Sequence, residues 1–169
     1  MRRSAPIVVL IVVAGVLTTF IAQNVKLAWN RTAQKRTMAD IRSIATAWEA
    51  RATRTNSYAV GSDMTLAKCS RTCSGTGLRR SVRFSDLERV LVPTYIRKLP
   101  ATDGWGNQLD FRVGDFIGDA VAQSYRIRST GSDGEFDNNT DSYLSRTIAR
   151  FEEDVVFADG TFLQYPEGT

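Results

Sequence analysis

The sequence predicts an α+β fold in which a long N-terminal helix, with a membrane-spanning half and an amphipathic half, packs on a small antiparallel sheet. Three observations predict it: an uncharged apolar segment near the N-terminus, a following apolar pattern of helical spacing, and short alternating segments separated by turns in the second half of the chain. The length of 169 residues suits one domain of ordinary size.

The apolar segment Ala5–Ala22 reads APIVVLIVVAGVLTTFIA. As a helix it would be about 27 Å long, close to the thickness of the hydrocarbon core of a bilayer. We therefore predict a membrane-spanning half over residues 5–22, after a short cytoplasmic N-terminus of residues 1–4. The membrane-helix residues of this prediction are Pro6, Ile7, Leu10, Gly15 and Phe20. A cleaved secretory signal is the alternative, although the residues before Ala22 make a poor small-x-small cleavage site.

Residues 23–55 form the predicted amphipathic half of the helix. Apolar side chains recur there at spacings of three and four residues, at Met38, Ile41, Ile44, Ala45, Trp48 and Ala52. One unbroken helix from about Ala5 to Thr55 would be about 75 Å long, whereas a break near Asn24 or Asn30 would separate an anchor from a second helix. In either case the apolar face needs a partner, which residues 56–169 must supply as a globular head.

The head reads as a small α+β body. Ser85 and Glu88 have the spacing of a capping box and predict a short helix that ends before Pro93. Asp159-Gly160 is a two-residue hairpin signal. Alternating or flanking segments predict an antiparallel sheet of three or four strands, over residues 108–113, 123–128, 154–158 and 161–165.

Composition restricts the function classes. The chain has 22 Lys and Arg residues, 18 Asp and Glu residues and no histidine. The absence of histidine excludes Ser-His-Asp and Cys-His nucleophile pairs and nearly every catalytic zinc or iron site, so we do not expect an enzyme. No basic motif interleaved with aromatic residues is present, and nucleic acid is not an expected partner.

The two cysteines, Cys69 and Cys73, predict a small disulfide loop. Without histidine or a third cysteine, a structural zinc site would lack ligands. Because disulfides persist in oxidising compartments, we expect the head outside the inner membrane. Two reduced, packed cysteines on the cytoplasmic side are the alternative.

Three segments resemble those of type II secretion major (G-type) pseudopilins, a family related to type IV pilins. LVPTYIRKLPATDGWGNQLDF resembles the proline-rich turn and the DPWGNPY-like segment of that family, YRIRSTGSDGEF resembles its YxxxSxGxDG strand and loop, and EEDVVFADGTF resembles its closing strand. The resemblance implies a pilin-like fold. Under this reading the core of the head contains Ile41, Ile44, Trp48 and Trp105.

The N-terminus departs from that family. Its members carry a short leader that ends in glycine, followed a few residues later by a glutamate. Aligned on the helix, Met1 stands about where the glycine belongs and Pro6 where the glutamate belongs. Proline cannot provide the charged contact that a glutamate makes in the apolar layer. We therefore do not expect leader processing of the usual kind, and assembly would need a different N-terminal contact.

The implied function is that of a structural subunit in a type II secretion pseudopilus-like filament that aids protein export across the outer membrane. Its localisation would be the bacterial inner membrane, with a single span and a periplasmic head. Its partners would be copies of itself through the N-terminal helix, other pseudopilins and the inner-membrane secretion platform. Two alternatives are a type IV pilin and a membrane-tethered module that never polymerises, with Arg79, Arg80 and Arg83 as a patch for an acidic partner.

The resemblance also implies a calcium ion between the SxGxDG loop and the last strands. Asp133 and Asp154 are the implied ligands, followed by Asp137 and the backbone around Ser132. Calcium prefers six to eight oxygen ligands, and carboxylates at close range need a cation to offset their repulsion. The alternative is a solvated acidic loop in which Asp133-Gly134 is a plain turn.

Overall fold

The computed structural model of the chain describes residues 5–60, 80–117, 121–137 and 145–166. In these segments the fold is α+β, as predicted, with two helices and six strands. The elements are α1 (Ala5–Thr55), β1 (Arg80–Ser81), α2 (Phe84–Leu91), β2 (Asp110–Ile117), β3 (Val121–Ser129), β4 (Arg146–Ile148), β5 (Val155–Ala158) and β6 (Thr161–Pro166).

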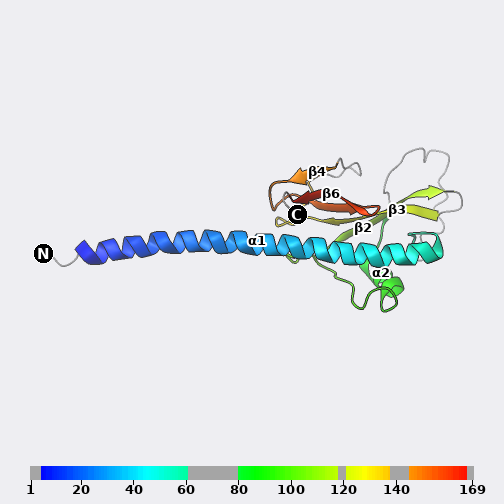
Figure 1. Cartoon of the computed structure of the whole chain (residues 1–169), viewed down its shortest axis with the longest axis horizontal. Coiled ribbons are helices and arrows are strands. Elements are labelled where there is room, and N and C mark those ends of the chain that lie inside the picture. Colours follow the sequence, from blue (N-terminus) through cyan, green and yellow to red (C-terminus); the bar gives the residue numbers. More distant parts are fainter. Residues whose placement is uncertain (1–4, 61–79, 118–120, 138–144, 167–169) are drawn as a thin grey trace.

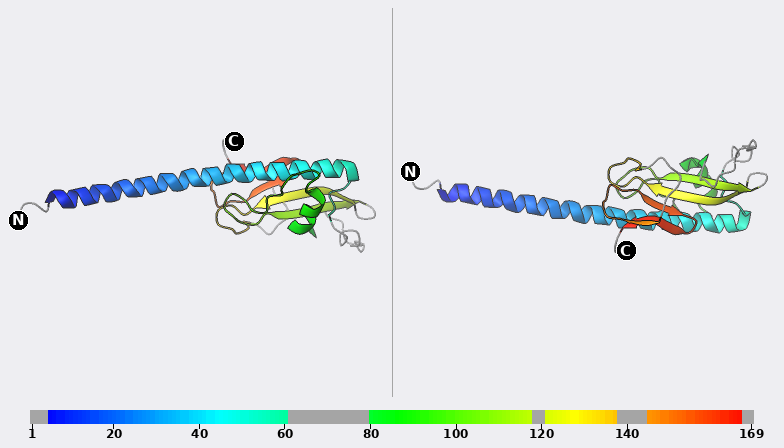
Figure 2. Two further views of the ribbon diagram at one scale, coloured as in Figure 1. Left: turned by 90° about the horizontal axis from the view of Figure 1, so that it is seen from below. Right: turned by 90° about the horizontal axis from the view of Figure 1, so that it is seen from above.

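The first helix is continuous, so the predicted unbroken helix is confirmed, and the alternative breaks at Asn24 and Asn30 do not occur. Its 51 residues correspond to a length of about 76 Å. Only the second part of α1 lies against the head, and the first part projects away from it (Figures 1 and 2). Among the residues whose side chains are described, which leave out residues 5–12, 16 and 17 of α1, no helical stretch combines the length and the apolar character that crossing a membrane requires.

The second part of α1 buries the apolar stripe that its spacing predicts. Met38, Ile41, Ile44, Ala45, Trp48 and Ala52 are all buried. Trp48 lies at the centre, with its ring 5.2 Å from that of Tyr125 and 6.3 Å from those of Tyr58 and Phe111. Its indole nitrogen donates to the Tyr58 carbonyl (3.1 Å), so the one polar atom of this side chain is satisfied inside the core.

The sheet is larger than predicted, and it is mixed. Its described strands have the order β1-β2-β3-β5-β6-β4. The neighbours from β1 to β6 are antiparallel, as predicted, but β4 pairs with β6 in parallel. The two added strands are the edge strands, and each has only two or three residues. Such short segments give no alternating pattern in the sequence, which explains why they were not predicted.

The four predicted strands are confirmed with shifts of a few residues at their ends, and so is the turn between β5 and β6. Asp159 and Gly160 both have positive φ, 48° and 88°, as a two-residue hairpin turn requires. The Asp159 carboxylate also accepts from the Tyr125 backbone N–H at 2.9 Å, which ties the turn to β3.

The capping-box prediction for α2 is wrong, although a helix is present and ends before Pro93 as expected. The N-cap residue is Arg83, so Ser85 lies inside the helix. The Arg83 carbonyl accepts from the N–H groups of Asp86 and Leu87 (both 3.1 Å), and no side chain caps this end. The backbone therefore closes the first turn without the hydroxyl that a capping box uses.

A turn at residues 103–107 connects α1 to the sheet. The buried Asp103 accepts from Trp105 N–H (3.0 Å) and Asn107 N–H (2.9 Å), and its other oxygen accepts from the Ser129 hydroxyl (2.7 Å). The backbone N–H of Gly104 donates to the Thr37 hydroxyl of α1 at 2.8 Å. The Asp103 carboxylate thus holds the turn to the end of β3, and the Gly104 N–H holds the same turn to the helix.

Gly104 allows this turn to contact the helix directly. A Cβ atom at this position would lie 2.0 Å from the Ala33 carbonyl oxygen and 2.6 Å from its carbon, and both are backbone atoms. No rotamer change can relieve such an overlap, so the turn would have to move away from α1.

We predict that Gly104→Ala destabilises the head by about 1–3 kcal/mol, the usual range for overpacking. For a chain of this size the melting temperature should fall by about 3–10 °C, measured by circular dichroism. Gly15→Ala is the matched control, because a Cβ there meets nothing within 4 Å. If Gly104→Ala melts with the unaltered chain, the close contact of turn and helix is contradicted.

Candidate functional site

Two regions correspond to the predicted functional residues: the projecting part of α1 and the acidic loop after β3. In the projecting part, every described side chain from Val13 to Trp29 is exposed. The large apolar side chains among them are Val13, Phe20, Ile21, Val25, Leu27 and Trp29. Contact with the head begins at Asn30, whose side-chain oxygen accepts from the Trp105 indole N–H at 3.2 Å.

The predicted residues of the long helix divide between its two parts. Ile41, Ile44 and Trp48 are fully buried in the head core. Trp105 lies half-buried against the helix, outside that core. Gly15 and Phe20 are exposed on the projecting part. The side chains of Pro6, Ile7 and Leu10, like the whole of Cys69 and Cys73, lie outside the described residues.

The acidic loop, residues 130–137, begins at the end of β3 and contains three of the four predicted ligands, Ser132, Asp133 and Asp137. Asp133 is exposed, and its carboxylate accepts from the Glu135 N–H (3.0 Å), which makes a local turn. The Ser132 N–H donates to the Phe151 carbonyl at 2.8 Å. Gly131, with φ of 67°, packs so close to the backbone of Phe151 and Glu152 that a Cβ would lie 2.7 Å from their oxygens. The loop is therefore fastened to the segment that precedes β5.

Asp137 and Asp154 are the two predicted ligands that lie together. The Asp137 carboxylate accepts from the backbone N–H of Asp154 at 2.9 Å. Asp154 itself is fully buried. Its carboxylate faces Arg128, with 3.8 Å between Oδ2 and the nearer guanidinium nitrogen.

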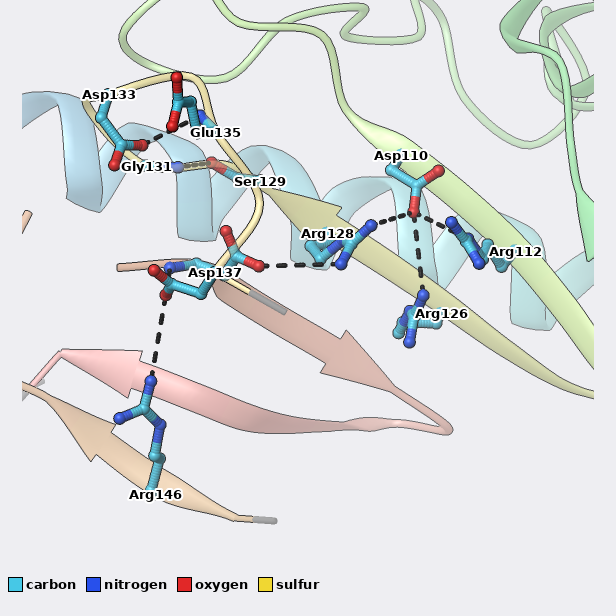
Figure 3. Close-up of polar contacts among 11 residues, drawn as sticks. Asp110, Arg112, Arg126, Arg128, Ser129, Gly131, Asp133, Glu135, Asp137 and Arg146 are labelled. Carbon is cyan, nitrogen blue, oxygen red and sulfur yellow. Dashed lines mark hydrogen bonds and ion pairs between the residues drawn. The ribbon is translucent and has the colours of Figure 1, made fainter. Parts of the chain in front are cut away.

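Three arginines of the sheet gather at another carboxylate of this region, that of Asp110 (Figure 3). On β2 and β3, Asp110 Oδ2 lies 3.1 Å from Arg112, 3.2 Å from Arg128 and 3.9 Å from Arg126. Arg126 and Arg128 are almost completely buried, at 1% and 2% exposure. They alternate along β3 with Tyr125 and Ile127, which face α1, so they lie on the opposite face of the sheet.

Arg146, on the edge strand β4, reaches the same region from the other side. Its guanidinium lies 3.6 Å from Glu153 and 4.0 Å from Asp137. With the Gln164 amide oriented to satisfy both neighbours, its oxygen accepts from Arg146 Nε (2.9 Å) and its nitrogen donates to the Asp154 carbonyl (3.2 Å). The acidic loop, β4 and β6 are thereby connected through one arginine.

These arginines were not identified in the sequence as site residues. Arg126 and Arg128 occupy the polar positions of an alternating strand, which ordinarily face solvent. The signal that would have found them is cross-strand charge: in the observed register Asp110 lies opposite Arg128, and Arg112 lies opposite Arg126. Like charges directly opposite each other are unfavourable, so an intervening carboxylate is required.

The described carboxylates do not gather as metal ligands. Across residues 5–60, 80–117, 121–137 and 145–166, no three Cys, Asp or Glu side chains converge on a position that a metal ion could occupy. Asp141, another acidic residue of the region, lies outside these ranges. Calcium stays a prediction of the resemblance.

Two of the three segments that carry the family resemblance contact each other. The Asn107 side-chain amide of the Trp-Gly-Asn turn donates to the Gly131 carbonyl of the SxGxDG loop at 2.7 Å. Together with the Asp103–Ser129 hydrogen bond (2.7 Å), this fixes the loop relative to the turn and hence to α1. Asp103, the buried centre of this arrangement, was not predicted from the sequence as a site residue.

A groove of about 550 Å³ lies between the start of α2, β2 and the acidic loop. Phe84, Asp110 and Phe136 line it, together with the exposed Arg83. Of the predicted basic patch, Arg80 lies in β1 and Arg83 caps α2, whereas Arg79 lies outside the described residues. The groove is therefore bordered by a positively charged side chain, a negatively charged side chain and two aromatic rings.

Comparison with known proteins gives no relative: no family model, curated protein or solved structure matches this chain.

Burial raises the pKa of Asp154 from 3.8 to about 6; Arg128 acts against this shift, and the nearby Asp137 and Asp133 add to it. In the unfolded chain the carboxyl group titrates near its ordinary value. The folded protein therefore holds this proton more tightly, and the contribution of Asp154 to stability increases as the pH falls from about 7 to about 4.

We predict that Asp154→Asn removes this increment. Free energies of unfolding from denaturant titration should show the unaltered chain gaining relative to the variant when the pH is lowered from about 7 to about 4.5. A difference between the two proteins that stays constant over this pH range would contradict a raised pKa at Asp154.

Proposed function

We propose that this chain is a structural subunit of a pseudopilus-like filament, anchored in the bacterial inner membrane by a single span, with its head in the periplasm. The observation that supports this function is the division of α1 at Asn30, where a projecting apolar part meets a part built into the head. The role is mechanical and not catalytic. Its partners are copies of the chain, other pseudopilins and an inner-membrane secretion platform, and the filament aids export across the outer membrane.

The dimensions of the projecting part support membrane anchoring. Residues 5–29 form about 37 Å of helix, longer than the hydrocarbon core of about 30 Å. The uncharged segment Ala5–Ala22 occupies the end farthest from the head. Trp29 is exposed at the end of the projecting part nearest the head. If residues 5–22 span the membrane, this end lies near the membrane–water interface, where tryptophan is enriched. The head would then lie close to the membrane surface.

The same exposed side chains support lateral association. Phe20, Ile21 and Val25 are each more than half exposed, and no part of the described head covers them. Between helices in a bilayer, association depends on van der Waals packing and not on transfer from water. Because Pro6 carries no carboxylate, contacts between the N-terminal ends of neighbouring copies would rest on such packing.

A membrane-tethered binding module is the second candidate. It is favoured by the groove beside β1 and α2, where Arg83 stands exposed for an acidic partner. In this case the projecting part of α1, residues 5–29, would serve as a stalk that only anchors the head. A type IV pilin would use the same stalk as the filament subunit does.

We predict that a photo-reactive residue at Ile21, in the full-length chain in bacterial membranes, gives a ladder of covalent multimers on irradiation. Packing of neighbouring stalks brings this side chain against another copy. The control is the same labelled chain dispersed in excess detergent before irradiation, which should remain monomeric. If Ile21, Phe20 and Val25 all yield monomers in membranes, the filament is contradicted and the tethered module is favoured.

A further inference from the structure

We propose that two arginines, Arg128 and Arg146, fasten the acidic loop of residues 130–137 to the rest of the head and supply the positive charge there in place of a calcium ion. Both arginines lie in the head, so their role does not depend on the proposed filament. They occupy the region in which the resemblance implies a calcium site.

Arg128 supplies a permanent positive charge beneath the loop. Its guanidinium lies 3.2 Å from Asp110 and 3.8 Å from Asp154, and its carbon stands 3.6 Å from the centre of the Phe136 ring. A guanidinium stays protonated at all ordinary pH values, and an aromatic face above it adds a favourable cation–π contact. Asp154, one of the implied calcium ligands, is therefore already opposite a buried cation.

Arg146 holds the other side of the loop. Its planar fork reaches Glu153, Asp137 and the Gln164 amide oxygen, which belong to three different parts of the head. Such a fork binds several oxygens at once with defined geometry, which a single ammonium group does not do. Its side chain is 45% exposed, so water screens the ion pairs partly, while the bond to the buried Gln164 is less accessible.

A divalent cation would have to compete with these contacts. The Asp137 carboxylate already accepts the Asp154 N–H at 2.9 Å and faces Arg146, and the Asp133 carboxylate accepts the Glu135 N–H at 3.0 Å. A calcium ion between Asp137 and Asp154 would be brought near two guanidinium groups of like charge, and it would need six to eight oxygens. The observed geometry thus favours Arg128 and Arg146, and not a calcium ion, as the source of positive charge at this loop.

The first arm of the test uses the purified full-length chain in detergent. Millimolar calcium and millimolar EGTA should give the same melting temperature to within about 1 °C. Titration of calcium alone into protein from which the chelator has been removed after treatment should give no saturable heat. A calcium-dependent rise of about 3 °C or more would overturn the proposal.

The second arm removes one arginine. Arg146→Ala should lower the melting temperature by about 2–6 °C, because Asp137, Glu153 and Gln164 lose their shared partner. Arg146→Lys keeps the charge and should recover less than half of the loss, since it lacks the fork. The matched control is Arg97→Ala, an exposed arginine in the segment after α2, which should change little. Equal melting temperatures of the Arg146→Ala and Arg97→Ala variants would contradict the role of Arg146 in holding the loop.

Discussion

The contact between α1 and the turn at Gly104 sets the geometry of the whole molecule. The space that a side chain would occupy at Gly104 is filled by the backbone of Ala33, so the turn and the helix are in direct backbone contact at this level. Beyond Ala33 toward the C-terminus, the helix contributes one side of the hydrophobic core. Before Asn30, the helix leaves the head and exposes its apolar side chains. One continuous helix therefore serves as stalk and as core element, without a joint between them.

The head is organised around two polar centres that the helix contact brings into register. Asp103 binds the turn and the end of β3, and Asn107 then fixes the acidic loop through Gly131. On the outer face of the sheet, Asp110 and Asp154 hold the buried Arg128. Buried charges are tolerated only when they are paired, so these contacts constrain the sheet register more strictly than apolar packing alone.

The features predicted from the sequence are those that local spacing determines. The stripe from Met38 to Ala52 follows from the helical period, and the hairpin at Asp159-Gly160 follows from backbone preferences of two residues. The parallel edge strand β4 and the burial of Arg126 were missed because both depend on segments distant in the sequence. At Trp105 the pattern of a turn gave no information on depth, and the ring lies against the helix instead of in the core. The disulfide and the residues of the predicted span stay predictions.

The measurement that tests the single rod most directly is the distance between spin labels on its two parts, in the full-length chain in detergent. Ile21 on the stalk and Ala50 beside the core are both exposed and are 29 residues apart. If the helix is continuous through the Ala33 contact, the distance between the two labels should have one narrow distribution centred at about 44 Å. A broad or markedly shorter distribution would mean that the chain bends between stalk and head, and the account would be contradicted.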